Sequence, residues 1–137
     1  MWIGKNYIKR RFVNSQEESF EKINPSTEEV LGSFPKTPKE TVDETIGFAR
    51  EAFEFWKKES RVKRADFMFK VAQIIDQRRD EIAAVISVET GKNYNESIAE
   101  VNEALHMAQY AFGSGRTPQG EAVASEIAEK DSYMLRK

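Results

Sequence analysis

Residues 61–92 read RVKRADFMFKVAQIIDQRRDEIAAVISVETGK, and their apolar side chains recur with the period of an α-helix. A first set, spaced by three and four residues, shares one helical face: Ala65, Met68, Ala72 and Ile75. The polar residues 77–80 interrupt this pattern. A second set then resumes it: Ile82, Val85, Ile86 and Glu89. Gly91 follows, where a helix C-cap favours a residue with positive φ, so we expect two helices end to end.

The composition indicates one soluble domain. The chain has 137 residues, of which 39% are hydrophobic and 32% charged, with a net charge of −2. This balance gives no basic footprint for nucleic acid, and no apolar run is long enough to span a membrane. Residues 1–5 lack the apolar core of a signal peptide, so we expect a cytoplasmic protein. The absence of cysteine excludes disulfides, thiolate metal sites and a cysteine nucleophile within this chain.

Residues 6–35 are expected to form short strands. Two antiparallel pairs are predicted from β-prone residues: 7–8 with 12–13, and 19–23 with 30–34. The second pair flanks an Asn-Pro-Ser-Thr sequence, in which proline presets φ for a tight turn. These strands are short, so the hairpins need a surface to pack against.

Residues 37–115 are expected to form a helical layer. Thr37, Pro38 and Glu40 have the spacing of a capping box, in which Thr37 is the N-cap. The helix that follows has an apolar face comprising Val42, Ile46, Ala49, Phe53 and Trp56. With the two helices of residues 61–92 and one more, the prediction is an α+β chain with about four helices.

The last of these helices is capped by Asn93 or Asn95. Its apolar stripe comprises Ile98, Val101, Leu105, Ala108 and Phe112. Gly113-Ser114-Gly115 ends it, and residues 116–129 are expected to form a loop without a clear period. Residues 131–137 start like a strand and stop soon after, so the chain looks cut.

Taken in order, these motifs resemble the N-terminal region of the NAD(P)-dependent aldehyde dehydrogenases. The segments that carry the resemblance are Asn24-Pro25-Ser26-Thr27-x-Glu29-Val30, Ala49-Arg50-x-Ala52-Phe53 with Trp56, Asp80-Glu81-Ile82-Ala83, Glu89-Thr90-Gly91-Lys92 and Gly120-Glu121. The chain departs from the family at Glu28, where a turn glycine is usual, at residues 9–11, where Gly-Gly is common, and at Asn93, where proline is common.

The resemblance implies that residues 1–137 are the N-terminal portion of a Rossmann-like α/β domain that binds NAD or NADP. It also implies oxidation of an aldehyde to a carboxylic acid through a cysteine thiohemiacetal, hydride transfer and a hydrolysed thioester. In the family the nucleophile, the general base and the dinucleotide loop come after this region. We therefore expect no catalytic or cofactor-binding residue here, no NAD or NADP bound to this chain, and no activity of the chain alone.

Glu89 is a candidate metal ligand. By resemblance it corresponds to a carboxylate that helps to bind a monovalent cation, together with main-chain carbonyls that here belong to Lys22 and Ile23. One carboxylate with backbone oxygens suits a hard cation. The alternative, which we favour, is that Glu89 lies one turn from a helix end and pairs with Lys92 on the surface.

The helix that contains His106 resembles the one that lines the aldehyde entrance channel of the family, which implies that Ala99 and Glu103 face this channel. The alternative is that both residues merely alternate between core and solvent. His106 has no partner base, nucleophile or metal ligand at a suggestive spacing, so we expect it to face solvent.

Three other features favour structural readings. Residues 113–118 contain two glycines but follow a helix rather than a strand, so we interpret them as a C-cap and loop, not a dinucleotide site. The basic residues Lys57, Lys58, Arg61, Lys63 and Arg64 lie among glutamates without interleaved aromatics, which disfavours nucleic acid. The carboxylate pairs Glu17-Glu18 and Glu28-Glu29 are explained by solubility.

Two other functions remain open beside an inactive fragment. The apolar faces of residues 42–56 and 98–112, separated from a sheet, would favour self-association or a protein partner. Alternatively, the chain is one half of a split enzyme, and the remainder of the enzyme docks onto it.

Overall fold

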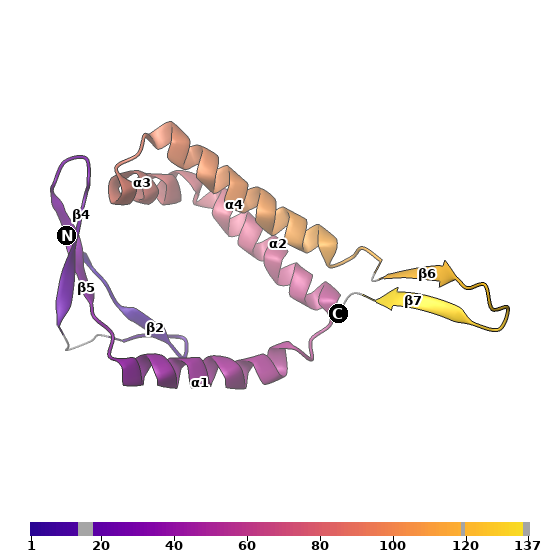
Figure 1. Ribbon diagram of the computed structural model, residues 1–137. Coiled ribbons are helices and arrows are strands. Elements are labelled where there is room, and N and C mark those ends of the chain that lie inside the picture. The colour runs from indigo at the N-terminus through magenta and orange to yellow at the C-terminus, as the bar shows by residue number, and fades with distance from the viewer. Residues whose placement is uncertain (14–17, 119, 136–137) are drawn as a thin grey trace.

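The computed structural model describes residues 1–13, 18–118 and 120–135. These residues form small sheets, then helices, then a hairpin that extends from the helical unit (Figure 1). The helices are α1 (Lys39–Trp56), α2 (Arg61–Gln77), α3 (Arg79–Thr90) and α4 (Tyr94–Ser114). The strands are β1 (Trp2–Ile3), β2 (Asn6–Ile8), β3 (Arg11–Val13), β4 (Ser19–Ile23), β5 (Val30–Pro35), β6 (Gly120–Ala124) and β7 (Asp131–Leu135). The predicted α+β class, with about four helices, is confirmed.

The N-terminal sheet has the order β1-β5-β4. The hairpin of β4 and β5 is as predicted, but the parallel pairing of β1 with β5 was not expected. Trp2 lies opposite Gly32 in this pairing, and a Cβ on Gly32 would come within 2.4 Å of the Trp2 carbonyl oxygen. Glycine at this position therefore lets β1 approach β5.

The predicted pairing of β2 with β3 is also confirmed, through a two-residue turn at Lys9 and Arg10. Both residues have positive φ, 48° and 66°. This is the backbone of the hairpin turn that favours Asn and Gly, although here it carries Lys and Arg. The polar connection predicted at residues 14–17 lies outside the described residues.

The core lies where α4 packs against α2 and α3. Ala72, Leu105 and Ala108 form a buried cluster, against which Met68 and Ile75 pack. Ala83 of α3 and Ser97 of α4 are completely buried. Small side chains at these positions let the helices approach closely. The predicted face of α2 and the predicted stripe of α4 are thus confirmed. In this structure α2 and α3 cover the α4 stripe, which we had expected to be open to self-association or a protein partner.

The polar residues between α2 and α3 interrupt the helix as predicted. Arg78 has φ −107° and ψ 18°, outside the helical region, and separates the two helices. Ser60 caps the start of α2 by accepting a hydrogen bond from the Lys63 amide (3.1 Å). Gly91 has φ 73° and ends α3 in the left-handed conformation, as its position predicted.

The predicted capping box of α1 is wrong. The helix begins at Lys39, its N-cap is Pro38, and no side chain caps it. Thr37 Oγ1 instead donates to Asn6 Oδ1 (3.1 Å) and accepts from Asn6 Nδ2 (2.9 Å). The hydroxyl is used to join β2 to the start of α1, so it is not available to the helix.

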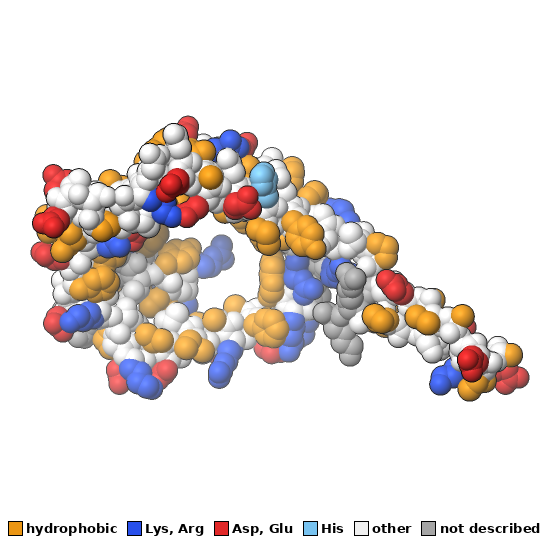
Figure 2. All heavy atoms as spheres, turned by 45° about the horizontal axis from the view of Figure 1, so that its top comes forward, with side chains coloured by type: hydrophobic (Ala, Val, Ile, Leu, Met, Phe, Trp, Pro, Cys, Tyr) orange, Lys and Arg blue, Asp and Glu red, His pale blue; other side chains and the backbone are white. Residues whose placement is uncertain are grey.

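Helix α1 has no buried residue. Its apolar side chains remain open, with Phe53 55% and Phe55 77% exposed. Figure 1 shows α1 apart from α2–α4 along most of its length, and Figure 2 shows an opening through the molecule with apolar side chains along its rim. Of the two apolar faces named in the sequence, the one on α1 is thus uncovered within the described residues, and the one on α4 is packed.

The loop predicted over residues 116–129 is also wrong in part, because β6 occupies residues 120–124 and pairs with β7. Every residue of these strands except Gly120 is exposed. A hairpin exposed on both faces needs no alternation of apolar and polar residues, so its sequence carries no strand period. The strand expected from residue 131 is confirmed to Leu135; residues 136–137 lie outside the described part.

Among the helices of the described ranges, none combines the length and the apolar character that crossing a membrane requires.

Candidate functional site

The turn between β4 and β5 is organised by Asn24, which is buried. Its side-chain oxygen accepts from the Ser26 amide (2.9 Å), and its backbone carbonyl accepts from the Glu28 amide (2.8 Å). Glu28 takes φ 61°. The resemblance implies a glycine at this position of the turn, and glycine adopts positive φ easily. Here Glu28 adopts the positive φ although it has a side chain.

This turn packs against the end of α3. Ser26 Oγ donates a hydrogen bond to the Gly91 carbonyl oxygen (2.7 Å). A Cβ on Gly91 would lie 2.6 Å from Ser26 Oγ and 2.8 Å from Pro25 Cγ. Gly91 is thus needed both for its backbone conformation and for the close approach of the turn. Sequence analysis missed the role of Ser26, although its place beside Pro25 in the turn motif was a usable signal.

Glu89 lies at this junction but does not pair with Lys92. Its carboxylate is 3.6 Å from Lys22 Nζ, both side chains being partly exposed. Lys92 instead forms an ion pair with Glu100 of α4. The preferred local pair is therefore wrong, because the fold brings β4 to Glu89 and brings α4 to Lys92.

The candidate cation site remains a prediction. The structure brings Glu89 close to Lys22, which precedes Ile23 at the end of β4. The described residues contain no cluster of three or more His, Cys, Asp or Glu side chains that could hold a metal ion. Only one carboxylate would face the ion, and the Lys22 ammonium already lies beside it, so the two cations would compete for Glu89.

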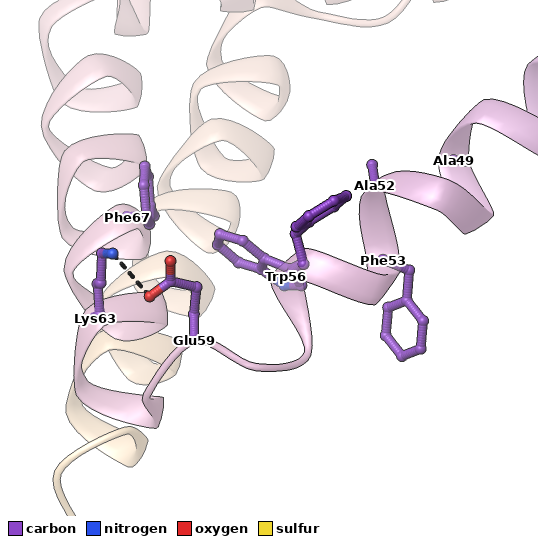
Figure 3. Close-up of a pocket in the computed structure, with 8 residues that line it drawn as sticks. Ala49, Ala52, Phe53, Trp56, Glu59, Lys63 and Phe67 are labelled. Atoms are coloured by element: carbon purple, nitrogen blue, oxygen red, sulfur yellow. Dashed lines mark ion pairs between the residues drawn. The ribbon is translucent and has the colours of Figure 1, made fainter.

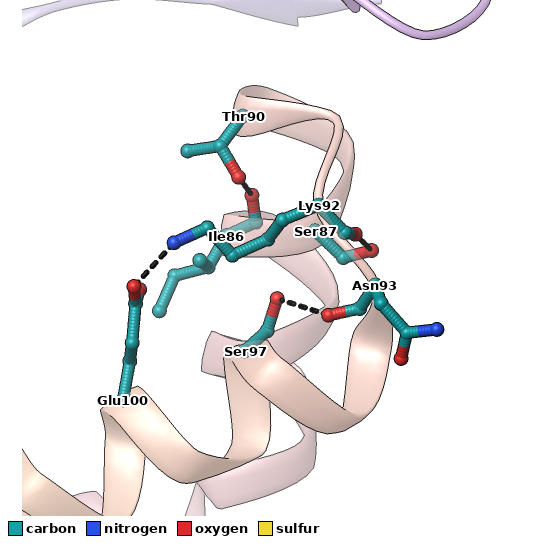
Figure 4. A network of polar contacts seen from close by, with 7 residues as sticks. All are labelled: Ile86, Ser87, Thr90, Lys92, Asn93, Ser97 and Glu100. Carbon is teal, nitrogen blue, oxygen red and sulfur yellow. Dashed lines mark hydrogen bonds and ion pairs between the residues drawn. The ribbon is translucent and has the colours of Figure 1, made fainter.

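Hydroxyl groups satisfy the backbone around the end of α3 and the start of α4 (Figure 4). Ser87 Oγ donates to the Lys92 carbonyl (2.8 Å), and Thr90 Oγ1 donates to the Ile86 carbonyl (2.6 Å). The buried Ser97 donates to the Asn93 carbonyl (3.2 Å). Asn93 is the N-cap of α4, one of the two predicted. This network serves the fold, because each hydroxyl bonds to a backbone carbonyl between the last turn of α3 and the start of α4; the Asn93 carbonyl also accepts from the Ser97 amide (3.1 Å).

An apolar groove lies between the end of α1 and the start of α2 (Figure 3). Its volume is about 580 Å³, and Phe53, Trp56 and Phe67 line it. The Trp56 and Phe67 rings are 5.3 Å apart between centroids. At its edge, Lys63 Nζ lies 2.8 Å from a Glu59 oxygen. The groove offers apolar surface and one ion pair.

The predicted channel residues Ala99 and Glu103 are both exposed on α4. His106 is exposed on the same helix, as expected, and appears in pale blue in Figure 2. Tyr110, 71% exposed, follows at the next turn. Sequence analysis did not single out Tyr110, although it lies seven residues after Glu103 and therefore on the same helical face.

One predicted structural reading is confirmed. Helix α4 continues to Ser114, so residues 113–118 are a helix end and its connection, not a loop after a strand. In the basic cluster, Lys57 pairs with Glu54 (2.6 Å) and Lys63 pairs with Glu59, so glutamates neutralise part of its charge.

The comparisons with known proteins agree with this geometry. The family model of the aldehyde dehydrogenase family matches residues 12–137. The chain is 36% identical over 133 residues to malonate-semialdehyde dehydrogenase of Bacillus subtilis subsp. natto, and 33% identical to that of Lacticaseibacillus casei. Each match covers 96% of this chain and 27% of the relative.

A similar solved structure is betaine aldehyde dehydrogenase from Staphylococcus aureus in complex with NAD+. It aligns with a TM-score of 0.83 and 28% identity, over 96% of this chain and 27% of that one. The chain thus spans about 27% of the length of the relatives it matches. The resemblance carried by the Asn-Pro and Glu-Thr-Gly-Lys motifs is confirmed: the chain belongs to the aldehyde dehydrogenase family.

Proposed function

We propose that this chain forms the N-terminal layer of an NAD(P)-dependent aldehyde dehydrogenase and has no dehydrogenase activity alone. The observation that carries the proposal is the coverage: nearly the whole chain matches, but only 27% of each relative. The uncovered apolar face of α1 supports it, because a helix without a buried residue lacks the packing that normally holds it.

The missing chemistry supports the same proposal. Attack on an aldehyde carbon to form a thiohemiacetal needs a thiolate, and this chain has no cysteine. When bound, NAD or NADP would supply the hydride acceptor. The part of this chain is to shape the wall of the aldehyde entrance with the exposed side of α4, including Ala99 and Glu103, and to support the dinucleotide domain with its helices.

The proposed function implies a partner for this chain, which is the remainder of the enzyme. That remainder is either continuous with this chain or encoded separately. Its contact surface is the α1 face with the groove beside Trp56 and Phe67. Burial of each large apolar side chain contributes roughly 1.5–3 kcal/mol, so covering this face would add substantially to stability.

Complementation tests the proposal. The purified chain is mixed with the Bacillus subtilis malonate-semialdehyde dehydrogenase from which the matched segment has been removed, and NADH or NADPH formation is followed with aldehyde present. We expect no activity from either polypeptide alone and activity from the mixture. Aldehyde-dependent NADH production by the 137-residue chain alone would overturn the proposal.

The competing occupant of the α1 face is a second copy of this chain. Light scattering with and without the complementing polypeptide separates the two. If the face serves the remainder of the enzyme, Phe53→Glu lowers recovered activity. If it serves self-association alone, the same substitution converts a dimer into a monomer and leaves complementation unchanged.

A further inference from the structure

The turn between β2 and β3 ends against the middle of α1 (Figure 1). Lys9 Nζ lies 3.3 Å from the centroid of the Phe48 ring, close enough for a cation–π interaction. Lys9 and Arg10 both have positive φ, which a residue with a Cβ adopts at a cost in stability. Asn or Gly would form the same turn with less strain, so the retained basic side chains indicate a function.

A cavity with a volume of about 520 Å³ lies between this turn and α1. Small-molecule sites typically have volumes of roughly 300–1,000 Å³. The aromatic part of the lining comes from Tyr7 of β2 and from Phe48 and Phe55 of α1. Lys9 and Arg10 line the cavity as well, so it places cations beside aromatic rings.

This cavity is a neighbour of the groove between α1 and α2. Ala52 and Phe55 line both of them. The two sites differ in what else they contain, because the groove has Trp56 and Phe67 and the cavity has the basic turn. The basic residues on which a bound anion depends therefore tell the cavity from the groove.

The side chains of the cavity define the class of ligand. The Lys9 ammonium has three N–H donors, and the Arg10 guanidinium is a planar fork that suits a carboxylate or a phosphate. The Phe55 side chain, 77% exposed, offers a ring on which a flat ligand can stack. Glu51 contributes a carboxylate, so the described lining residues include two cations and one anion and retain a positive charge.

We propose that this cavity binds a small aromatic anion. Its carboxylate or phosphate group lies on Lys9 and Arg10, and its ring packs against Phe55 and Tyr7. The Phe48 ring holds the Lys9 ammonium at the cavity before a ligand arrives, which lowers the cost of ordering this side chain on binding. The inference goes beyond the proposed function and does not rest on it, because it concerns a site within this chain alone.

Binding to the purified chain is measured by isothermal titration calorimetry. The probes are 2-naphthoate and 2-naphthyl phosphate, which share a ring system and differ in the anionic group, and the uncharged 2-naphthylmethanol is the ligand control. We expect each anion to bind about tenfold more tightly than the alcohol, since each cation contributes severalfold. Tighter binding of one anion identifies the preferred group. Equal affinities for the anions and the alcohol would overturn the proposal.

The deciding variant combines Lys9→Gly with Arg10→Gly. It removes both cations and relieves the strain of the turn, so a loss of binding does not come from a loss of fold. Circular dichroism checks that the helices are retained. We expect the affinity for 2-naphthoate to fall about tenfold, to that of the alcohol. An unchanged affinity contradicts the proposal.

The matched control combines Lys57→Gln with Lys58→Gln. It removes two adjacent cations that follow α1, beside the groove, and should leave the affinity for 2-naphthoate as it is. A loss of affinity in this control alone would place the anion in the groove. An equal loss in both variants would show unspecific attraction to basic residues, and either result overturns the proposal.

Discussion

Ser26 Oγ donates a hydrogen bond to the carbonyl oxygen of Gly91, 65 residues later in the chain, at 2.7 Å. This contact joins the Asn-Pro turn to the end of α3. It joins two of the motifs by which the sequence resembles its family, so each of these motifs helps to position the other. Four predictions follow from this junction and from the packed helices.

Replacing Gly91 by alanine should destabilise the protein by about 1–3 kcal/mol, because a side chain would be strained at positive φ and would collide with Ser26 and Pro25. Denaturant unfolding measures the change. The control is Gly47→Ala on α1, where a Cβ meets no atom within 4 Å. That substitution should stabilise by roughly 0.5–1 kcal/mol, since alanine favours a helix interior. Equal effects at the two sites would contradict the junction.

Replacing Glu28 by glycine should stabilise the protein by about 0.5–1.5 kcal/mol, because Glu28 takes φ 61° in the turn. Thermal unfolding at fixed protein concentration measures the gain. Glu28→Ala removes the charge but keeps a Cβ, so it should give little or no gain. If alanine stabilises as much as glycine, the charge rather than the backbone is responsible.

Replacing Leu105 by alanine should cost about 2–4 kcal/mol, because this side chain fills the buried cluster between α2 and α4. Circular dichroism during denaturant unfolding measures the loss. Met107 is 63% exposed on the same helix and provides the control. Met107→Ala should change the free energy of unfolding by less than about 0.5 kcal/mol. A comparable cost at both positions would show that α4 is not packed as described.

The phenol of Tyr94 should lose its proton at a higher pH than an ordinary tyrosine. Partial burial and its hydrogen bond to Asp80 Oδ1 (3.0 Å) raise the pKa of Tyr94 above its usual value. A raised pKa means that the contact adds stability below the usual phenol pKa of about 10, and that this contribution is lost as the pH rises through the raised pKa. Phenolate absorbance against pH should lose one late-titrating component in Tyr94→Phe. Loss of a component that titrates at the usual phenol pKa would refute the contact.

The helices could be predicted because their apolar period and their end signals agree. Ala65, Ala72, Leu105 and Ala108 are buried as the spacing predicts, and Gly91 ends α3 as expected. β1 could not be predicted, because two residues cannot show a period and because their partner strand is distant in the sequence. β6 was not predicted either, because every residue of this strand except Gly120 is exposed and its sequence therefore shows no alternation.

At the candidate site, two predicted contacts between sequence neighbours were wrong, because the side chains contact residues that are distant in the sequence. Thr37 has the spacing of an N-cap but bonds to Asn6, and Glu89 has the spacing to pair with Lys92 but lies beside Lys22. In both cases the fold places a strand residue beside the side chain, and this residue takes the place of the predicted partner in the helix. Ala99 and Glu103 are both exposed on α4. The family resemblance, and not the helical spacing, singled them out, and their place in a channel stays a prediction.

The attachment of α1 has a consequence for the handling of the isolated chain. The helix is held near its start by the Thr37–Asn6 hydrogen bonds, in the middle by Lys9 Nζ, 3.3 Å above the Phe48 ring, and at its end by Trp56 against Phe67. Between these points its backbone has no protecting core. A protease should therefore cut first within residues 39–56 and leave a helical remnant that resists digestion.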